Sequence, residues 1–228
     1  MGPSLVVQSS PARVPTWVER CMATVRAWAP RYEHVDDSFL DLAPGWVHDA
    51  CSSVLPITDV ARLVLLQERL RTHERVVWLD ADVLVFDGAA IDVSSPADVA
   101  VCVERWVTGA PGGGLQAVPF VCNAALSARN VDALLDLTLE RVRAGNVSDR
   151  SLGPDLLTPL HRSSPFGEIV GVSVASPHVV REEPGAWELL TSSVPWPVGA
   201  LNLCWSMSAG ADAFVDRLLG DDTRQRDR

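Results

Sequence analysis

The strongest constraint on the fold of this chain is the segment 76–86, which reads VVWLDADVLVF. Its first four residues form a continuous apolar run, and such runs are typical of strands that are buried on both faces of a sheet. Two aspartates interrupt the segment, so it is too polar to span a membrane. A strand of this kind needs helices on both faces of its sheet. The segment therefore predicts a central strand of an α/β fold.

Helical and extended patterns alternate along the rest of the chain. Thr16 and Glu19 form a possible capping box at the start of the first helical segment. The chain has 228 residues, which suits a single domain covering residues 1–228. We expect an α/β fold with a central, mostly parallel mixed sheet flanked by helices. Helices are predicted at 15–30, 58–70 and 131–145, an irregular segment at 40–57, strands at 4–10, 74–86, 98–104, 118–128 and 168–176, and a loop or edge segment at 194–206.

Charge and cysteine usage exclude several classes of protein. The formal net charge is −10 and no long Lys/Arg run occurs, which argues against a nucleic-acid groove. The five cysteines are odd in number, widely spaced and without a CxxC motif, which indicates buried free thiols in a reducing compartment. The first residues do not resemble a signal peptide. We therefore expect a cytoplasmic protein with no transmembrane segment.

The pair Asp80 and Asp82 is the candidate metal site. Aspartates rarely lie fully buried without partners, and two neighbouring carboxylates repel each other. A bound cation removes both objections, and carboxylate oxygens suit Mg²⁺ or Mn²⁺ that shares its shell with substrate phosphates. Ligands of open α/β sheets bind beyond the carboxyl ends of strands, where this pair is expected. The alternative is a turn that carries two solvated aspartates.

The helix before this strand carries a second candidate pair. Asp59 and Arg62 are three residues apart and therefore share one helix face. The alternative is a local salt bridge that stabilises the helix by only tenths of a kcal/mol.

Several segments together resemble glycosyltransferase family 32, in particular its DXD-containing sugar-binding region. The resemblance rests on ITDVARLVLLQERL and VVWLDADVLVFDG, on the N-terminal LVVQSSPARVPTWVER, and on the later segments NAALSARN, GPDLLTPL and ALNLCWSM. It covers nearly the whole chain. The strand ERVVWLDADVLVFDG is also similar to family 8, which shares the GT-A fold. The resemblance implies a GT-A domain that transfers hexose from a nucleotide sugar, UDP-hexose or GDP-mannose, with Mn²⁺ or Mg²⁺ as cofactor.

The resemblance also implies roles for individual residues. Gln8 is expected near the nucleotide. Asn202 stands near the position where the family usually has a His, and it is expected to offer an oxygen to the metal. The catalytic residues implied are Asp80, Asp82 and Asp155; those binding the donor are Gln8, Asp59, Arg62, Asp80 and Asn123; and those binding the metal are Asp80, Asp82 and Asn202.

The expected acceptor is a saccharide or another hydroxyl compound, and the resemblance implies retention of anomeric configuration. Two alternatives remain open. The chain lacks the family's usual Gly-Gly pair before the DXD strand and its usual His, which would suit a catalytically inactive relative that binds nucleotide sugars. A GT-A-like sugar nucleotidyltransferase is the other alternative. Its N-terminal segment VVQSSPARVP is a poor version of the triphosphate-binding loop that such an enzyme needs.

Two further features concern the surroundings of the site. The Gly-rich stretch 109–116 lacks the Lys-Ser/Thr of a P-loop, and we expect a mobile loop over the pocket. Trp106 and Trp205 are candidates for stacking on a sugar or a base, although core packing explains tryptophans equally well.

Overall fold

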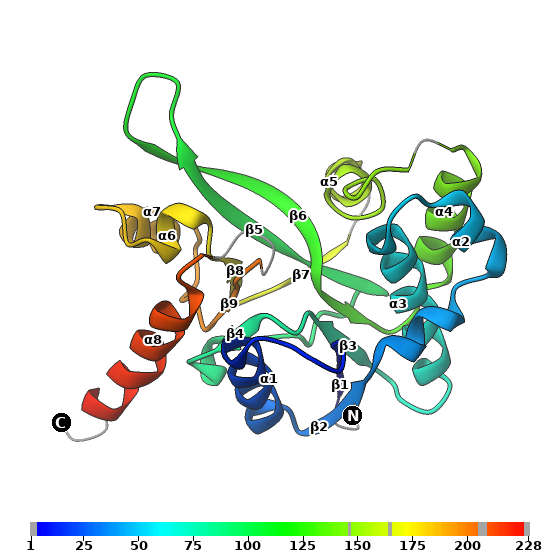
Figure 1. Cartoon of the computed structure of the whole chain (residues 1–228), viewed down its shortest axis with the longest axis horizontal. Helices are drawn as coiled ribbons and strands as arrows, with labels where there is room; N and C mark the ends of the chain where they lie inside the picture. The colour runs from blue at the N-terminus through cyan, green and yellow to red at the C-terminus, as the bar shows by residue number, and fades with distance from the viewer. Residues whose placement is uncertain (1–3, 146, 164–165, 205–208, 226–228) are drawn as a thin grey trace.

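A mixed six-stranded sheet forms the centre of the molecule. The structure is a computed structural model that describes residues 4–145, 147–163, 166–204 and 209–225. The strand order of the sheet is β2-β1-β3-β6-β5-β7 (Figure 1). β6 runs antiparallel to both neighbours, whereas the other pairs are parallel, so the sheet is mostly parallel as predicted. The strands are β1 (Leu5–Ser9), β2 (Arg31–Val35), β3 (Val76–Leu79), β5 (Val99–Gly109), β6 (Leu115–Ala128) and β7 (Gly167–Ile169).

A second, three-stranded sheet has the order β4-β9-β8. β4 (Val83–Val85) pairs antiparallel with β9 (Ala200–Asn202), and β8 (Val172–Val174) pairs parallel with β9. The chain therefore changes sheets between β3 and β4. The prediction of one strand over 74–86 is wrong, because the chain turns at the two aspartates. The predicted late strand likewise divides into β7 and β8.

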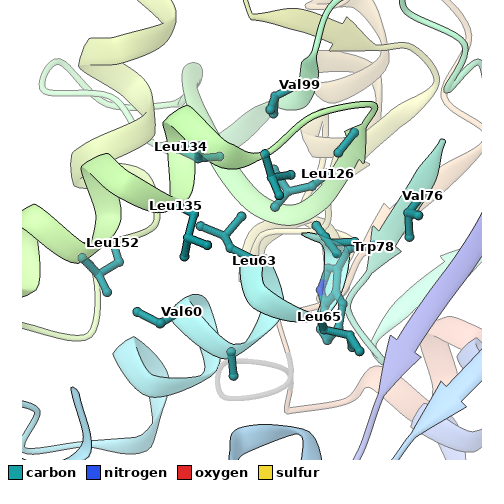
Figure 2. Packing of buried hydrophobic residues seen from close by; sticks show 14 of the residues in the cluster. Val60, Leu63, Leu65, Val76, Trp78, Val99, Leu126, Leu134, Leu135 and Leu152 are labelled. Carbon is teal, nitrogen blue, oxygen red and sulfur yellow. The ribbon is translucent and has the colours of Figure 1, made fainter. Parts of the chain in front are cut away.

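Different helices cover the two faces of the large sheet, because side chains alternate along each strand. Trp78 of β3 packs with α3 and α4 on one face (Figure 2). Its neighbour Val77 packs on the other face with Val25 of α1. The helices are α1 (Thr16–Trp28), the 3-10 helix η1 (Asp37–Leu42), α2 (Gly45–Ala50), α3 (Val54–Leu70), the 3-10 helix η2 (Gly88–Ala90), α4 (Asp132–Arg143), α5 (Pro154–Ser163), α6 (Pro177–Val180), α7 (Ala186–Ser192) and α8 (Ala211–Gln225).

The helix boundaries differ from the prediction at three places. Thr16 is the first helical residue of α1 and Pro15 holds the cap position without a side-chain hydrogen bond, so the predicted capping box does not form. α3 begins at Val54, four residues before the predicted start. Pro56 is tolerated there because the N–H groups of the first turn have no partner within the helix. The segment predicted as irregular contains the second half of η1 and all of α2.

The β5–β6 hairpin is longer than predicted and projects beyond the rest of the molecule (Figure 1). Its tip is closed by hydrogen bonds from the Gly113 N–H to the Ala110 carbonyl and from the Ala110 N–H to the Gly114 carbonyl, both 3.0 Å. The Gly-rich stretch is therefore the turn of this hairpin, and the prediction of a loop over the pocket is wrong.

The cysteines are free thiols, as the sequence predicts, and Cys21 and Cys102 are buried. Within the part of the chain that the structure describes, no helix combines the length and apolar character needed to cross a membrane.

Candidate active site at the junction of the two sheets

Asp80 and Asp82 lie where the chain passes from the large sheet to the small one. The Asp80 N–H donates to the Ala124 carbonyl of β6 at 2.8 Å, and the Val83 N–H donates to the Asp80 carbonyl at 3.1 Å. The Asp82 carbonyl accepts from the Leu203 N–H, directly after β9, at 3.0 Å. Asp80 is thus attached to one sheet and Asp82 to the other. The Asp80 side chain is 31% exposed and Asp82 is 9% exposed.

Arg62 orients the Asp80 carboxylate. Its guanidinium donates to Asp80 Oδ1 at 2.9 Å and to the Asn123 carbonyl, and it lies 4.7 Å from the centre of the Trp78 ring. The Trp78 indole N–H donates to the same Asp80 Oδ1 at 2.7 Å. Because both donors converge on Oδ1, neither uses Oδ2. Arg62 is only 5% exposed, so its guanidinium is held in place by packing and keeps the Asp80 carboxylate in one orientation.

Asp59 and Asn123 extend this network on the same side of β3. The Asn123 amide donates to Asp59 Oδ1 at 2.6 Å, and the same oxygen lies 3.9 Å from the Arg62 guanidinium. Burial raises the Asp59 pKa to about 6, and Arg62 and Asn123 oppose this rise only in part. The predicted Asp59–Arg62 pair is therefore part of a larger buried network, and it does more than stabilise its own helix.

The Gly-Pro segment of the resemblance, at Gly153 and Pro154, reaches this network as well. A Cβ atom at Gly153 would come within 3.1 Å of the Asn123 side-chain oxygen, so the backbone passes close to that amide. Asp155 follows in the first turn of α5, where its side chain is 51% exposed and pairs with Arg150 at 3.4 Å. The catalytic role of Asp155 stays a prediction.

Gln8 lies beneath the site with no exposed surface. Its amide donates to the Asp80 carbonyl at 2.9 Å, and its side-chain oxygen accepts from the Tyr32 hydroxyl at 3.1 Å. In this arrangement Gln8 fixes the backbone that carries the first aspartate. A contact with the nucleotide stays a prediction.

Asn202 lies at the other side of the pair, opposite Val83 in the small sheet. Its side-chain oxygen accepts from the Cys204 N–H at 3.1 Å, and its amide donates to Glu104 Oε1 at 3.1 Å. The predicted metal ligand is therefore beside Asp82 in the fold, with one lone pair of its oxygen already in use.

Glu104 is the site residue that the sequence analysis missed. It is 1% exposed, and its Oε2 has no hydrogen-bond partner among the described residues. Its pKa is raised to about 8, mainly by burial and also by the negative charges of Asp80 and Asp82, whereas the Asn202 amide and the Cys122 thiol oppose the rise. A signal was present, because Ala100, Cys102 and Glu104 alternate along β5 and a lone glutamate on an apolar strand face needs an explanation.

The residues present fit a divalent cation only in part. Carboxylate and amide oxygens are ligands that Mg²⁺ and Mn²⁺ accept, and Asp80 Oδ2 is not used by the donors that hold this carboxylate. Among the described residues, however, no three His, Cys, Asp or Glu side chains group closely enough to hold a metal ion. A cation at this pair would need oxygens from the substrate, which is common for Mg²⁺ bound with phosphates.

No protein-family model and no curated protein sequence matches this chain. Solved structures do match. A glycosyltransferase involved in the glycosylation of the major capsid of PBCV-1 superposes with a TM-score of 0.50 at 13% identity, over 94% of this chain and 100% of that one. The galactosyltransferase LgtC, in complex with donor and acceptor sugar analogs, gives 0.48 at 15% identity over 95% of both chains. GlyE of Streptococcus pneumoniae TIGR4 gives 0.49 at 12% identity, over 98% of this chain and 64% of that one.

The first of these likenesses, together with the sheet order, defines the class of fold. The chain has the GT-A type α/β fold, in which a central mixed sheet is flanked by helices. The assignment to family 32 or to family 8 stays a prediction.

Proposed function

We propose that this protein is a metal-dependent glycosyltransferase that moves a hexosyl group from a UDP- or GDP-linked sugar to a hydroxyl of a saccharide or other acceptor. The observation that carries the proposal is the junction between β3 and β4. There, Asp80 and Asp82 leave the carboxyl end of a central strand with Arg62, Asp59 and Asn123 packed beside them. Ligands of open α/β sheets bind beyond such strand ends.

Asp80 and Asp82 would hold Mn²⁺ or Mg²⁺, with Asn202 as a weaker oxygen ligand. When bound, the cation would supply Lewis-acid stabilisation of the negative charge that develops on the leaving diphosphate. Arg62 keeps the Asp80 carboxylate in one orientation, so that Oδ2 stays available. Asp59 and the Asn123 amide offer an acceptor and a donor of hydrogen bonds for sugar hydroxyls.

In the proposed reaction the bond between the anomeric carbon and the diphosphate oxygen breaks, and the electron pair stays with the diphosphate. The acceptor oxygen bonds to the anomeric carbon on the same face, and its proton passes to the departing diphosphate. Retention through a covalent intermediate would need an ionised carboxylate beside the sugar. Glu104 does not suit this role, because burial raises its pKa to about 8 and so disfavours the ionised form. We therefore favour the same-face displacement.

The test is hydrolysis of a panel of nucleotide sugars in the presence of Mn²⁺ or Mg²⁺. We expect release of nucleoside diphosphate by the wild type and a loss of at least about 100-fold in Asp82→Asn, because a catalytic cation stabilises the transition state by several kcal/mol. Asp136→Asn, on the exposed side of α4, is the matched control and should leave the rate unchanged.

One structural observation favours a second candidate, a protein that binds nucleotide sugars without turnover. Asn202 already shares its side chain with Glu104 and the Cys204 N–H, so its contribution to a metal is reduced. Titration of UDP and GDP with Mn²⁺ separates the two candidates. Binding without hydrolysis of any nucleotide sugar, also when saccharide acceptors are added, would favour the second candidate. Absence of binding would contradict the assignment of Asp80 and Asp82 to a donor site.

A further inference from the structure

The β5–β6 hairpin has two faces of different character. Its register pairs Glu104 with Phe120 and Trp106 with Val118. Residues directly opposite each other in an antiparallel pair point to the same side, and so do residues two positions apart on one strand. These two pairs and the next pair along the hairpin, Thr108 with Gln116, therefore lie on one side of it. We call this side the hairpin face; it consists of Glu104, Trp106, Thr108, Gln116, Val118 and Phe120.

The body of the protein covers part of the opposite side of the hairpin, although Pro119 on that side is exposed. Val107 has no exposed surface and belongs to a buried cluster with Leu190 of α7. The Arg105 side chain donates to the Ser193 carbonyl at the end of α7 at 3.1 Å. On the hairpin face, by contrast, Val118 is 41% exposed and both aromatic side chains remain partly exposed. The hairpin projects beyond the rest of the molecule, so the hairpin face extends away from the body of the protein (Figure 1).

The chemistry of the hairpin face suits a saccharide. The rings of Trp106 and Phe120 are 6.2 Å apart at an interplanar angle of 65°, which gives two apolar surfaces of different orientation. Thr108 and Gln116 add a hydroxyl and an amide without charge. A pyranose ring presents an apolar C–H side and a rim of hydroxyls, which match aromatic surfaces and uncharged polar groups. Three apolar side chains are too few for a stable protein interface, which buries about 800 Å² on each partner.

The hairpin face leads directly to the proposed donor site. Its inner end is Glu104, which accepts a hydrogen bond from Asn202. Asn202 is opposite Val83 in the small sheet, so it lies next to Asp82. The Cys122 thiol lies beside this carboxyl and lowers its pKa, and Glu104 Oε2 is buried with no hydrogen bond of ordinary geometry among the described residues. A chain of sugars on this face would bring one end to the carboxylate pair.

We propose that the hairpin face binds an oligosaccharide acceptor, whose rings stack on Trp106 and Phe120 and whose reacting end lies toward Glu104. This inference rests on the proposed function and names the acceptor class of the same site. Trp205, the other tryptophan considered for stacking, lies outside the described residues.

Binding is tested without donor or metal, by saturation-transfer NMR with a panel of free mono- to tetrasaccharides. We expect at least one oligosaccharide to bind the wild type, with affinity about tenfold lower in Trp106→Ala because its stacking surface is lost. Trp106→Phe should retain most of the affinity. Trp46→Ala is the matched control, since this partly exposed tryptophan lies on α2 beneath Arg143 and away from the hairpin.

Failure of this inference is distinguishable from failure of the proposed function. Donor hydrolysis by water is measured on the wild type without acceptor, so it reports on the donor site separately from saccharide binding, and it should be unchanged in the control Trp46→Ala. Saccharide binding that depends on Trp106 in a protein without donor hydrolysis would support the hairpin face and reject the transferase. If no saccharide binds the wild type, or if Trp106→Ala binds as the wild type does, the inference is wrong.

A second variant distinguishes loss of saccharide binding from misfolding and tests whether a second copy of the chain occupies the hairpin face. Val118→Asp places a charge on an exposed position, so the fold should be retained, and saccharide binding should weaken. Sedimentation of both proteins reports whether the same face joins two copies of the chain. A dimer that dissociates in Val118→Asp while saccharide binding is unchanged would overturn the inference.

Discussion

Replacement of Glu104 by glutamine should stabilise the metal-free protein at alkaline pH and have little effect at acidic pH. Glu104 is 1% exposed, and burial is the main reason why its pKa rises to about 8. Glutamine has nearly the same shape and remains neutral. Its oxygen can accept from Asn202, and its amide stands where a protonated carboxyl has its O–H. The variant therefore imitates the neutral acid at every pH.

The sign of the effect follows from the direction of the shift. The folded protein holds its Glu104 proton up to about pH 8, whereas the unfolded chain releases it near the usual value of 4.5. Between these values the folded state binds more protons, so the wild type loses stability as pH rises through this window. One pKa unit corresponds to about 1.4 kcal/mol, which sets an upper limit of about 5 kcal/mol. The effective dielectric constant of protein interiors is well above that of a dry core, which reduces this limit. We therefore expect the free energy of unfolding of the wild type to fall by about 2–4 kcal/mol across the window.

The assay is thermal unfolding of wild type and Glu104→Gln in EDTA at pH 5 and at pH 8.5. A chain of this size changes its Tm by about 2–4 °C per kcal/mol, so the difference in Tm between the two proteins should widen by about 4–16 °C at the higher pH. Glu188→Gln, at an exposed position of α7, is the control, and its Tm should equal that of the wild type at both pH values. If the difference between Glu104→Gln and wild type is the same at both pH values, the buried carboxyl does not titrate in this window and the reasoning is refuted.

Two further substitutions test the scaffold of the site by thermal unfolding. Arg62→Met should lower the free energy of unfolding by about 3 kcal/mol and the Tm by about 6–12 °C, because the Asn123 carbonyl and the Asp80 carboxylate lose their charged donor. A change in Tm below about 2 °C would contradict this role. Gly171→Ala should also cost about 3 kcal/mol, since the residue has φ +83° and a Cβ would lie 2.1 Å from the Ala90 carbonyl oxygen. A Tm equal to the wild type in Gly171→Ala would show that the backbone adjusts.

The sequence predicted those parts of the fold and site that depend on local periodicity. The apolar run 76–79 is β3, and the aspartates follow at its carboxyl end as expected. Asp59 and Arg62 share a face of α3 and reach Asn123 and Asp80, because a spacing of three residues places side chains side by side on a helix.

The remaining features depend on pairings between distant segments. The apolar run 83–86 looks like a continuation of the strand before it, and only the antiparallel partner β9, more than a hundred residues later, moves it into another sheet. Glu104 was missed for the same reason. Its importance comes from Asn202, which reaches it across a separation of 98 residues. The hairpin was predicted too short because its exposed outer half lacks the apolar alternation of a core strand.

The geometry of the carboxylate pair depends on how the two sheets pack against each other. Asp80 is fixed by Arg62 and β6 of the large sheet, whereas Asp82 is fixed by the backbone that follows β9. The separation of the two carboxylates is therefore set by the contact between the sheets. Within the small sheet, β4 and β9 approach closely at Gly199, where a Cβ would lie 2.2 Å from the Asp87 carbonyl oxygen, and Gly199 in turn donates to the Gly171 carbonyl at 2.8 Å. Gly199 thus contributes to the site, because its small size lets β4, which directly follows Asp82, pair with β9.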